Sequence, residues 1–151
     1  MKERVGTMKA KTYLLQLQKL DISINQKLME LHQLQSKLKI GLKTISYDME
    51  KIQTSSSTEA SFAQLVEKKI DLENEINAEI DSFIDKKHEI INQIQSLDNP
   101  LFIMVLYKRY AEYKSHRQIT REMYYSIQHV QRLHQQALRE FEQKYLQQNE
   151  I

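Results

Sequence analysis

The sequence predicts an all-α protein in which a long antiparallel helical hairpin precedes a three-helix module with a helix-turn-helix. Three observations support this fold class. The 151 residues include only 2 Gly and 1 Pro, fewer than strands, hairpins and ligand-cradling loops need. Gln, Lys, Glu, Leu and Ile dominate the chain, and all but Ile are strong helix formers. Leu and Ile also recur at steps of three or four residues, which is typical of helices with one buried face.

The first helix of the hairpin is predicted from about Lys9 to Lys39. Its apolar stripe consists of Leu14, Leu17, Leu20, Ile24, Leu28, Leu31, Leu34 and Leu38. Gly41 follows at the place where a left-handed cap residue belongs. The stretch from Ser46 to Ser57 is polar and rich in turn-forming residues. We therefore expect the chain to reverse at about residues 41–57.

The second helix is predicted from Thr58 to about Leu97. Its stripe consists of Phe62, Leu65, Val66, Ile70, Leu72, Ile76, Ile80, Phe83, Ile84, Ile91, Ile94 and Leu97. Lys87 and His88 interrupt the stripe, and we expect them at a solvated edge. Asn99 is predicted to cap the next helix, with Pro100 in its first turn. This divides the chain into a long helical hairpin, residues 1–99, and a helix-turn-helix module, residues 100–151.

Three short helices are predicted after residue 99. The first spans Leu101 to Tyr113 and has a broad apolar face of Phe102, Val105, Leu106 and Tyr110. Ser115 can cap the second, which would bury Ile119 and Met123. Tyr124 and Tyr125 make the turn, and Ser126 caps the third helix. The buried face of this last helix is predicted to contain Val130, Leu133, Ala137 and Leu138.

The charge distribution indicates where a polyanion would bind. The formal net charge is only +2, but residues 101–151 carry eight Lys or Arg against five Asp or Glu. From Lys114 to Arg139 there are five basic residues and one acid, Glu122. We therefore expect double-stranded DNA as the partner of this segment. The alternative from the residues alone is a helical bundle whose charges are only solvated.

The last helix carries the candidate base-reading residues. These are Ser126, Ile127, Gln128, His129, Gln131, Arg132 and Gln135. Gln can pair with adenine through two hydrogen bonds, and Arg with guanine. Lys114, Arg117, Arg121 and Arg139 are expected to contact phosphates, and Lys108 and Arg109 to extend this basic band.

These patterns resemble known proteins at two levels. The segments Leu106–Tyr110 and Tyr113–Ser115, the spacing of Ile119, Met123, Ser126 and Val130, and the segment Ala137–Phe141 resemble the region-four helix-turn-helix of bacterial sigma factors. Lys11–Leu14, Gln18–Ile22, Lys51–Ser55, Lys87–Ile94 and Tyr107–Phe141 resemble a family of small proteins from phages and prophages of Gram-positive bacteria. The second resemblance covers nearly the whole chain after Met8.

The phage family is similar in its C-terminal half to late-gene transcriptional regulators of the RinA and ArpU type, which implies promoter binding or contact with RNA polymerase. The sigma-factor positions that face DNA correspond to Ile127, Gln128, His129, Gln131 and Arg132. Two residues depart from the usual motif. Thr120 stands where a very small residue lets the helices approach, and Tyr124 stands in the turn where Gly, Asn or Asp tolerates unusual backbone angles. A motif that packs without reading DNA is the alternative that these departures leave open.

Other chemistry has little support. The absence of Cys excludes thiolate catalysis and Cys-ligated zinc. His129 and His134 are five residues apart, so we expect no metal site, and the carboxylate run from Asp71 to Asp85 reads as a solvated face. No catalytic residue, cofactor or phosphate-binding glycine loop is predicted. Without a signal peptide or an apolar run of spanning length, we expect no membrane association and a location in the cytoplasm of a host bacterium.

The remaining expectations concern partners. The apolar stripes of the long helices would also serve self-association, so a homodimer is expected, and it would suit two DNA half-sites. Host RNA polymerase is an additional candidate partner. The rival hypothesis is a protein-interaction module that occupies a host protein, such as RNA polymerase or a defence nuclease, in place of DNA.

Overall fold

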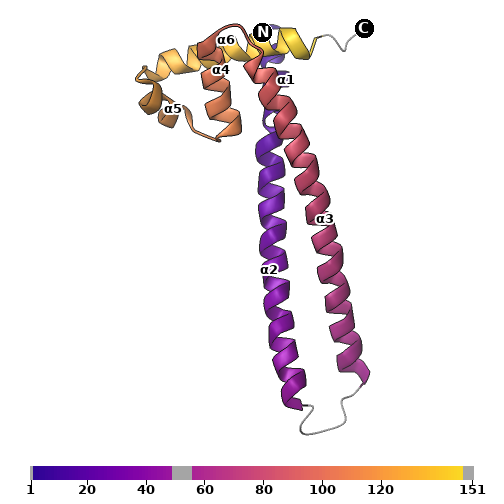
Figure 1. The fold of residues 1–151 in the computed structure, drawn as a ribbon. Coiled ribbons are helices and arrows are strands. Elements are labelled where there is room, and N and C mark those ends of the chain that lie inside the picture. The colour runs from indigo at the N-terminus through magenta and orange to yellow at the C-terminus, as the bar shows by residue number, and fades with distance from the viewer. Residues whose placement is uncertain (1, 49–55, 148–151) are drawn as a thin grey trace. The chain divides into compact units, whose positions relative to one another are not determined.

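The computed structural model describes residues 2–48 and 56–147, with side chains for residues 8–42 and 59–147. It is all-helical, as predicted, and the described residues contain no strand. The helices are α1 (Lys2–Leu14), α2 (Gln16–Asp48), α3 (Ser56–Gln95), α4 (Pro100–Leu106), α5 (His116–Met123) and α6 (Ile127–Tyr145) (Figure 1). A π-helical turn, η1 (Tyr107–Ala111), follows α4 directly.

The chain folds into two compact units. Unit 1 contains Met1–Asp21 and Phe83–Ile151, and unit 2 contains Ile22–Ser82. Each of the helices α2 and α3 is divided between the two units, with one segment in unit 1 and another in unit 2.

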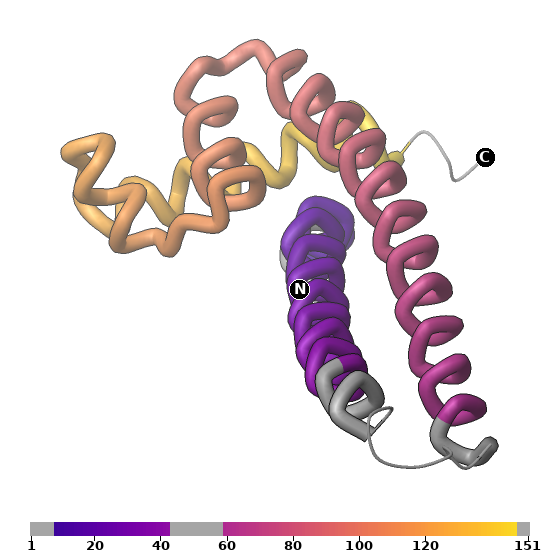
Figure 2. Tube along the Cα trace, turned by 60° about the horizontal axis from the view of Figure 1, so that its bottom comes forward, coloured from indigo at the N-terminus to yellow at the C-terminus, as the bar shows by residue number. Residues whose placement is uncertain are grey.

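Unit 2 consists of antiparallel segments of α2 and α3 that lie side by side (Figure 1, Figure 2). Its buried apolar side chains are Ile24, Leu38, Leu72 and Ile76. Lys27 of α2 forms ion pairs with Glu75 and Glu79 of α3, and the distance from Lys27 Nζ to Glu75 Oε1 is 2.7 Å. Parts of the apolar stripes predicted for the long helices therefore pack on each other here. Leu28 and Ile70 were predicted in these stripes but are 42% and 49% exposed, and Ile84, in the part of α3 that belongs to unit 1, is 56% exposed.

The predicted chain reversal at residues 41–57 is wrong in its first half. The helix α2 continues through Gly41 and ends at Asp48. Gly41 does not take the left-handed conformation of a cap, and a Cβ at this position would lie 3.7 Å from the Phe62 ring. A single helical Gly costs about 1 kcal/mol, which a packed helix of this length tolerates. Residues 49–55 of the predicted turn lie outside the described residues.

The first predicted helix is also divided. Leu15 separates α1 from α2, and α1 begins at Lys2 rather than near Lys9. Helical hydrogen bonding nevertheless passes through this point, because the Leu15 N–H donates to the Lys11 carbonyl at 2.9 Å. The Leu15 carbonyl in turn accepts from the Lys19 N–H at 3.2 Å.

Unit 1 has the larger core. Residues from the N-terminal part of the chain, such as Ala10, pack there with residues from the C-terminal part, such as Phe141. The buried side chains of this core come from α1, the start of α2, the end of α3 and the turn after it, α4, η1 and α6. They are Ala10, Leu14, Leu17, Ile90, Ile94, Leu97, Leu106, Tyr110, Ala137, Leu138 and Phe141. Polar contacts support this core, since the Tyr13 hydroxyl donates to Gln93 Oε1 at 2.8 Å. The helix α6 is thereby fixed by apolar burial along one side.

The segment from Asn99 to Lys114 directs the chain into α5. As predicted, Asn99 caps α4 by accepting the Leu101 N–H at 3.0 Å, with Pro100 at the start of the helix. After η1, Tyr113 has a φ of 60°, and the Lys114 N–H donates to the Lys108 carbonyl at 3.0 Å. The single predicted helix from Leu101 to Tyr113 is thus an α-helix followed by a π-helical turn.

Candidate functional site

The helix α5 begins with the cap that the sequence predicts. The Gln118 N–H donates to Ser115 Oγ at 3.2 Å, and the Ser115 N–H donates to Gln118 Oε1 at 2.8 Å. Two N–H groups that the helix itself cannot pair are therefore satisfied reciprocally. Ile119 is fully buried, as predicted. Met123 is only half-buried, because it is the last residue of α5 and lies next to the turn.

The turn between α5 and α6 contains Tyr124, Tyr125 and Ser126. Tyr124 ends α5 in the left-handed conformation, with φ 57° and ψ 35°, and its side chain is 92% exposed. This conformation costs a residue with a Cβ roughly 1–2 kcal/mol. Ser126 caps α6, since its Oγ accepts the His129 N–H at 3.2 Å. A capped helix, a turn and a second capped helix therefore follow one another at these residues.

One face of α6 is buried against α4, α5 and α1. Val130, Leu133, Ala137 and Leu138 are buried, as the sequence predicts. The same face also contains three residues that the prediction missed, and these are His134, Phe141 and Glu142. Their positions follow the same steps of three and four residues, so the periodicity already placed them on this face.

The opposite face of α6 is exposed and free of acids. Its side chains line a shallow, open hollow, and they are Gln128, Gln131, Arg132, Gln135, Gln136 and Arg139. These residues follow one another at helical spacing and so form one stripe, which we call the α6 stripe. No Asp or Glu occurs from Ile127 to Arg139. Gln136 was not among the predicted candidates.

Three other predicted base-reading residues lie at the beginning of α6 outside this stripe. Ser126 uses its hydroxyl to cap the helix. His129 is half-buried and meets the Tyr125 ring edge-on, with 4.6 Å between the ring centroids. Ile127 is 40% exposed.

Some of the cations predicted to contact phosphates form ion pairs within the protein, and others are exposed. Lys114 Nζ lies 2.5 Å from Glu112 Oε2 and 2.5 Å from Glu122 Oε1. Lys108 Nζ lies 2.8 Å from Glu122 Oε2. Hydrogen bonds from Lys108 and then Lys114 lower the pKa of Glu122. Both lysines are therefore neutralised by carboxylates in the protein itself.

Three arginines near α6 are differently placed. Arg117 and Arg121 of α5 and Arg132 of α6 are exposed, and they form no ion pair among the described residues. Together with Arg139 of the α6 stripe, they account for the positive charge that the sequence placed between Lys114 and Arg139.

A buried polar cluster under α6 was not predicted. The Tyr110 hydroxyl of η1 lies 2.7 Å from His134 Nε2 of α6. The ring of His116 from α5 packs edge-on against His134, with 4.8 Å between the centroids. Burial lowers the pKa of His134 to about 3, and the neighbouring His116, Arg109 and Lys11 contribute. Burial likewise lowers the pKa of His116.

The side chains of this cluster pack η1, α5 and α6 against one another. Burial disfavours the charged imidazolium, so both rings are held neutral between α5, η1 and α6. No group of three or more His, Cys, Asp or Glu that could hold a metal ion occurs in the described part of the chain. The signal available in the sequence was the position of His134, which lies between Leu133 and Ala137 on the predicted buried face of α6.

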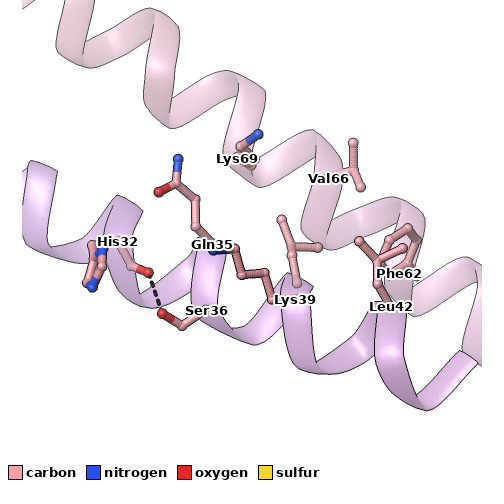
Figure 3. A pocket seen from close by; sticks show the side chains of 9 residues that line it. His32, Gln35, Ser36, Lys39, Leu42, Phe62, Val66 and Lys69 are labelled. Atoms are coloured by element: carbon pink, nitrogen blue, oxygen red, sulfur yellow. Dashed lines mark hydrogen bonds between the residues drawn. The ribbon is translucent and has the colours of Figure 1, made fainter.

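Unit 2 has a groove of about 510 Å³ between α2 and α3 (Figure 3). Its apolar lining comes from Leu38, Leu42, Phe62 and Val66, and its polar lining from His32, Gln35, Ser36, Lys39 and Lys69. Ser36 Oγ donates to the His32 carbonyl at 3.0 Å within α2, and Lys69 pairs with Glu73. None of the lining residues forms a nucleophile–base pair, so the groove has no evident chemistry.

Comparisons of the chain with models of known protein families, with curated proteins and with solved structures find no match. Across residues 2–48 and 56–147, no helix combines the length and the apolar character that crossing a membrane requires.

Proposed function

We propose that the chain is a phage-type transcriptional regulator that binds promoter DNA through a helix-turn-helix formed by α5 and α6. In this proposal, α2 and α3 are the arms of a long helical hairpin, and the three-helix module that follows resembles region four of sigma factors. The observation that carries the proposal is the α6 stripe, an exposed row of Gln and Arg without acids, opposite a face that is fully buried.

The local geometry supports α6 as the recognition helix. Recognition helices contact base edges through residues in their N-terminal half, while their opposite face packs against the preceding helix. In α6, Gln128, Gln131 and Arg132 occupy that half and are exposed. Val130 and Leu133 alternate with them and are buried. The buried face prevents the helix from rotating its polar side chains inward.

The electrostatics also favour DNA. Glu122 is the one acid between Lys114 and Arg139, and its charge is already compensated by Lys108 and Lys114. The potential around the beginning of α6 therefore comes from Arg117, Arg121 and Arg132. Exposed arginines supply the attraction to phosphates that positions a protein on a duplex.

The wider context of the proposal is a cytoplasmic regulator in a bacterial host that acts as a homodimer, with host RNA polymerase as a further partner. Large apolar side chains on α2 within unit 2 support self-association, because Ile22, Met29 and Ile40 are 49%, 65% and 66% exposed. Two copies would present two recognition helices to two half-sites.

The test measures binding of the chain to a fluorescently labelled duplex library by fluorescence anisotropy. We expect the wild-type chain to bind and Arg132→Ala to weaken binding by about tenfold, since a good Arg–base contact contributes about 1–3 kcal/mol. Lys68→Ala is the matched control, because it removes an exposed cation from α3 in unit 2. Equal losses in the two variants, or no binding by the wild type, would contradict the proposal.

One observation favours the second candidate, a module that binds a host protein. The turn presents apolar surface at one place, because Tyr124, Tyr125 and Ile127 are 92%, 36% and 40% exposed. Exposed aromatic residues are common at protein interfaces. This candidate predicts that RNA polymerase or a defence nuclease co-purifies with the chain, that Arg132→Ala preserves the complex, and that the double variant Tyr124→Ser, Ile127→Ser breaks it.

A further inference from the structure

We propose that the α6 stripe selects a short half-site of A·T pairs containing one G·C pair, with adenines read by Gln128 and Gln131 and the guanine read by Arg132. This inference rests on the proposed function, and it names the DNA sequence class that the same surface would bind.

The chemistry of the stripe limits what it can recognise. Four of its six side chains are Gln, which has one donor and one acceptor group at its end. In the major groove, this pair matches adenine, which offers N7 as an acceptor and its N6 amino group as a donor. Guanine offers two acceptors, N7 and O6, which match the two parallel N–H groups of Arg. The stripe has no carboxylate that could accept from cytosine.

The spacing sets the length of the half-site. Gln128 and Gln135 are two helical turns apart, which corresponds to about 10 Å along the helix axis. A duplex rises by about 3.4 Å per base pair. A helix lying along the groove therefore brings Gln128, Gln131 and Gln135 over about four successive base pairs. Gln131 and Arg132 are adjacent, so the G·C pair that Arg132 reads lies next to the A·T pair that Gln131 reads.

The residues beside the stripe point to the same base composition. Ile127 is 40% exposed at the start of α6, and an apolar side chain in the major groove contacts the methyl group of thymine. His129 packs edge-on against Tyr125, which removes its ring from the base-reading set. The His129 ring, which could have contacted guanine, is therefore occupied by Tyr125. The side chain of Ile127 remains, and it suits the methyl group of an A·T pair.

The experiment is selection of bound duplexes from a randomised library with the full chain, followed by sequencing. We expect a half-site of about four base pairs with two adenine positions and one guanine. Gln131→Ala should abolish the preference at one adenine position and leave the others, a loss of about tenfold at that position. Arg132→Lys keeps the charge but loses the two-pronged contact, so it should reduce the guanine preference while total binding stays strong.

Gln143→Ala is the matched control, because Gln143 is an exposed residue of the same type near the end of α6. It should leave the selected motif unchanged. A motif that lacks adenine, or one that Gln131→Ala leaves intact, overturns this inference while DNA binding itself stands. A chain that enriches no duplex at all overturns both this inference and the proposed function.

Discussion

The Tyr110 hydroxyl lies 2.7 Å from His134 Nε2 and joins η1 to the buried face of α6. His134 is 3% exposed and Tyr110 is 2% exposed, so this hydrogen bond lies within the core of unit 1. Both groups are uncharged at neutral pH, since burial raises the pKa of Tyr110 to about 12 and lowers that of His134 to about 3. The bond lies on the same face of α6 as the buried apolar side chains, and the burial of this face determines which side chains of α6 are exposed.

The buried His134 predicts that the protein loses stability in mild acid. The unfolded chain binds a proton at His134 below a pH of about 6.5, whereas the folded chain does so only near pH 3. The unfolded state therefore binds more protons between these values, and stability falls as the pH falls through this range. We expect a loss of about 2 kcal/mol between pH 7.5 and pH 5 from this residue.

Urea unfolding at pH 7.5, 6 and 5 measures this loss. The variant His134→Gln keeps a partner for the Tyr110 hydroxyl and cannot titrate, so its stability should change less over the same range. His88→Gln is the control, because His88 is exposed on α3. If the His134→Gln and wild-type stabilities fall in parallel, burial of His134 is not the cause.

The left-handed Tyr124 predicts a stabilising substitution. Tyr124→Gly removes the steric cost of φ 57° and gives up little packing, because the side chain is 92% exposed. We expect a gain of up to about 1 kcal/mol in the free energy of unfolding. Tyr125→Gly is the comparison, and it should destabilise the protein because the Tyr125 ring contacts His129. A Tyr124→Gly variant that is less stable than wild type would show that the ring makes a contact of its own.

The cap at Ser126 predicts a loss of helix stability. Ser126→Ala removes the acceptor for the His129 N–H and should cost about 1 kcal/mol. Ser126→Asp should retain the cap and most of the stability. The matched control is Ser36→Ala in the middle of α2, where the hydroxyl only donates to a carbonyl that the helix already uses. Thermal unfolding of the three variants measures their stabilities, and Ser126→Ala should be the least stable. If Ser126→Ala is as stable as Ser126→Asp, the cap does not contribute as predicted.

The carboxylate of Glu122 predicts a variant with stronger binding to DNA of any sequence. Glu122→Gln removes the carboxylate that pairs with Lys108, so Lys108 becomes available for phosphates, whereas Lys114 keeps its ion pair with Glu112. The slope of log affinity against log salt should become steeper by about 0.9 for each new phosphate contact. Glu89→Gln, which releases Lys86 on α3, is the control and should leave the slope unchanged. An unchanged slope in Glu122→Gln would place Lys108 outside the DNA interface.

The parts that could be predicted from the sequence are those governed by local chemistry. Asn99, Ser115 and Ser126 cap helices because their side chains satisfy N–H groups that begin a helix. Val130, Leu133 and Leu138 are buried because helical spacing places them on one face. These local rules do not depend on the rest of the fold.

The missed features depend on packing between distant segments. Gly41 lies within a helix because the apolar stripe of α2 packs on α3, and this outweighs the propensity of a single residue. His134 is buried because Tyr110, 24 residues away, supplies its hydrogen bond. One of the two ion pairs of Lys114 depends on Glu122, which the turn of the chain after η1 brings close. A linear pattern carries no information about such pairings.

The most direct test of the central claim is the accessibility of the α6 stripe in the presence of DNA. The chain contains no Cys, so a single reporter can be placed by Gln131→Cys, Gln143→Cys or Lys68→Cys. The rate of maleimide labelling is then measured with and without a bound duplex. We predict that DNA slows labelling of Gln131→Cys at least tenfold and leaves Lys68→Cys and Gln143→Cys unchanged. Equal labelling of Gln131→Cys in the free and the DNA-bound protein would contradict the assignment of α6 as the helix that reads DNA.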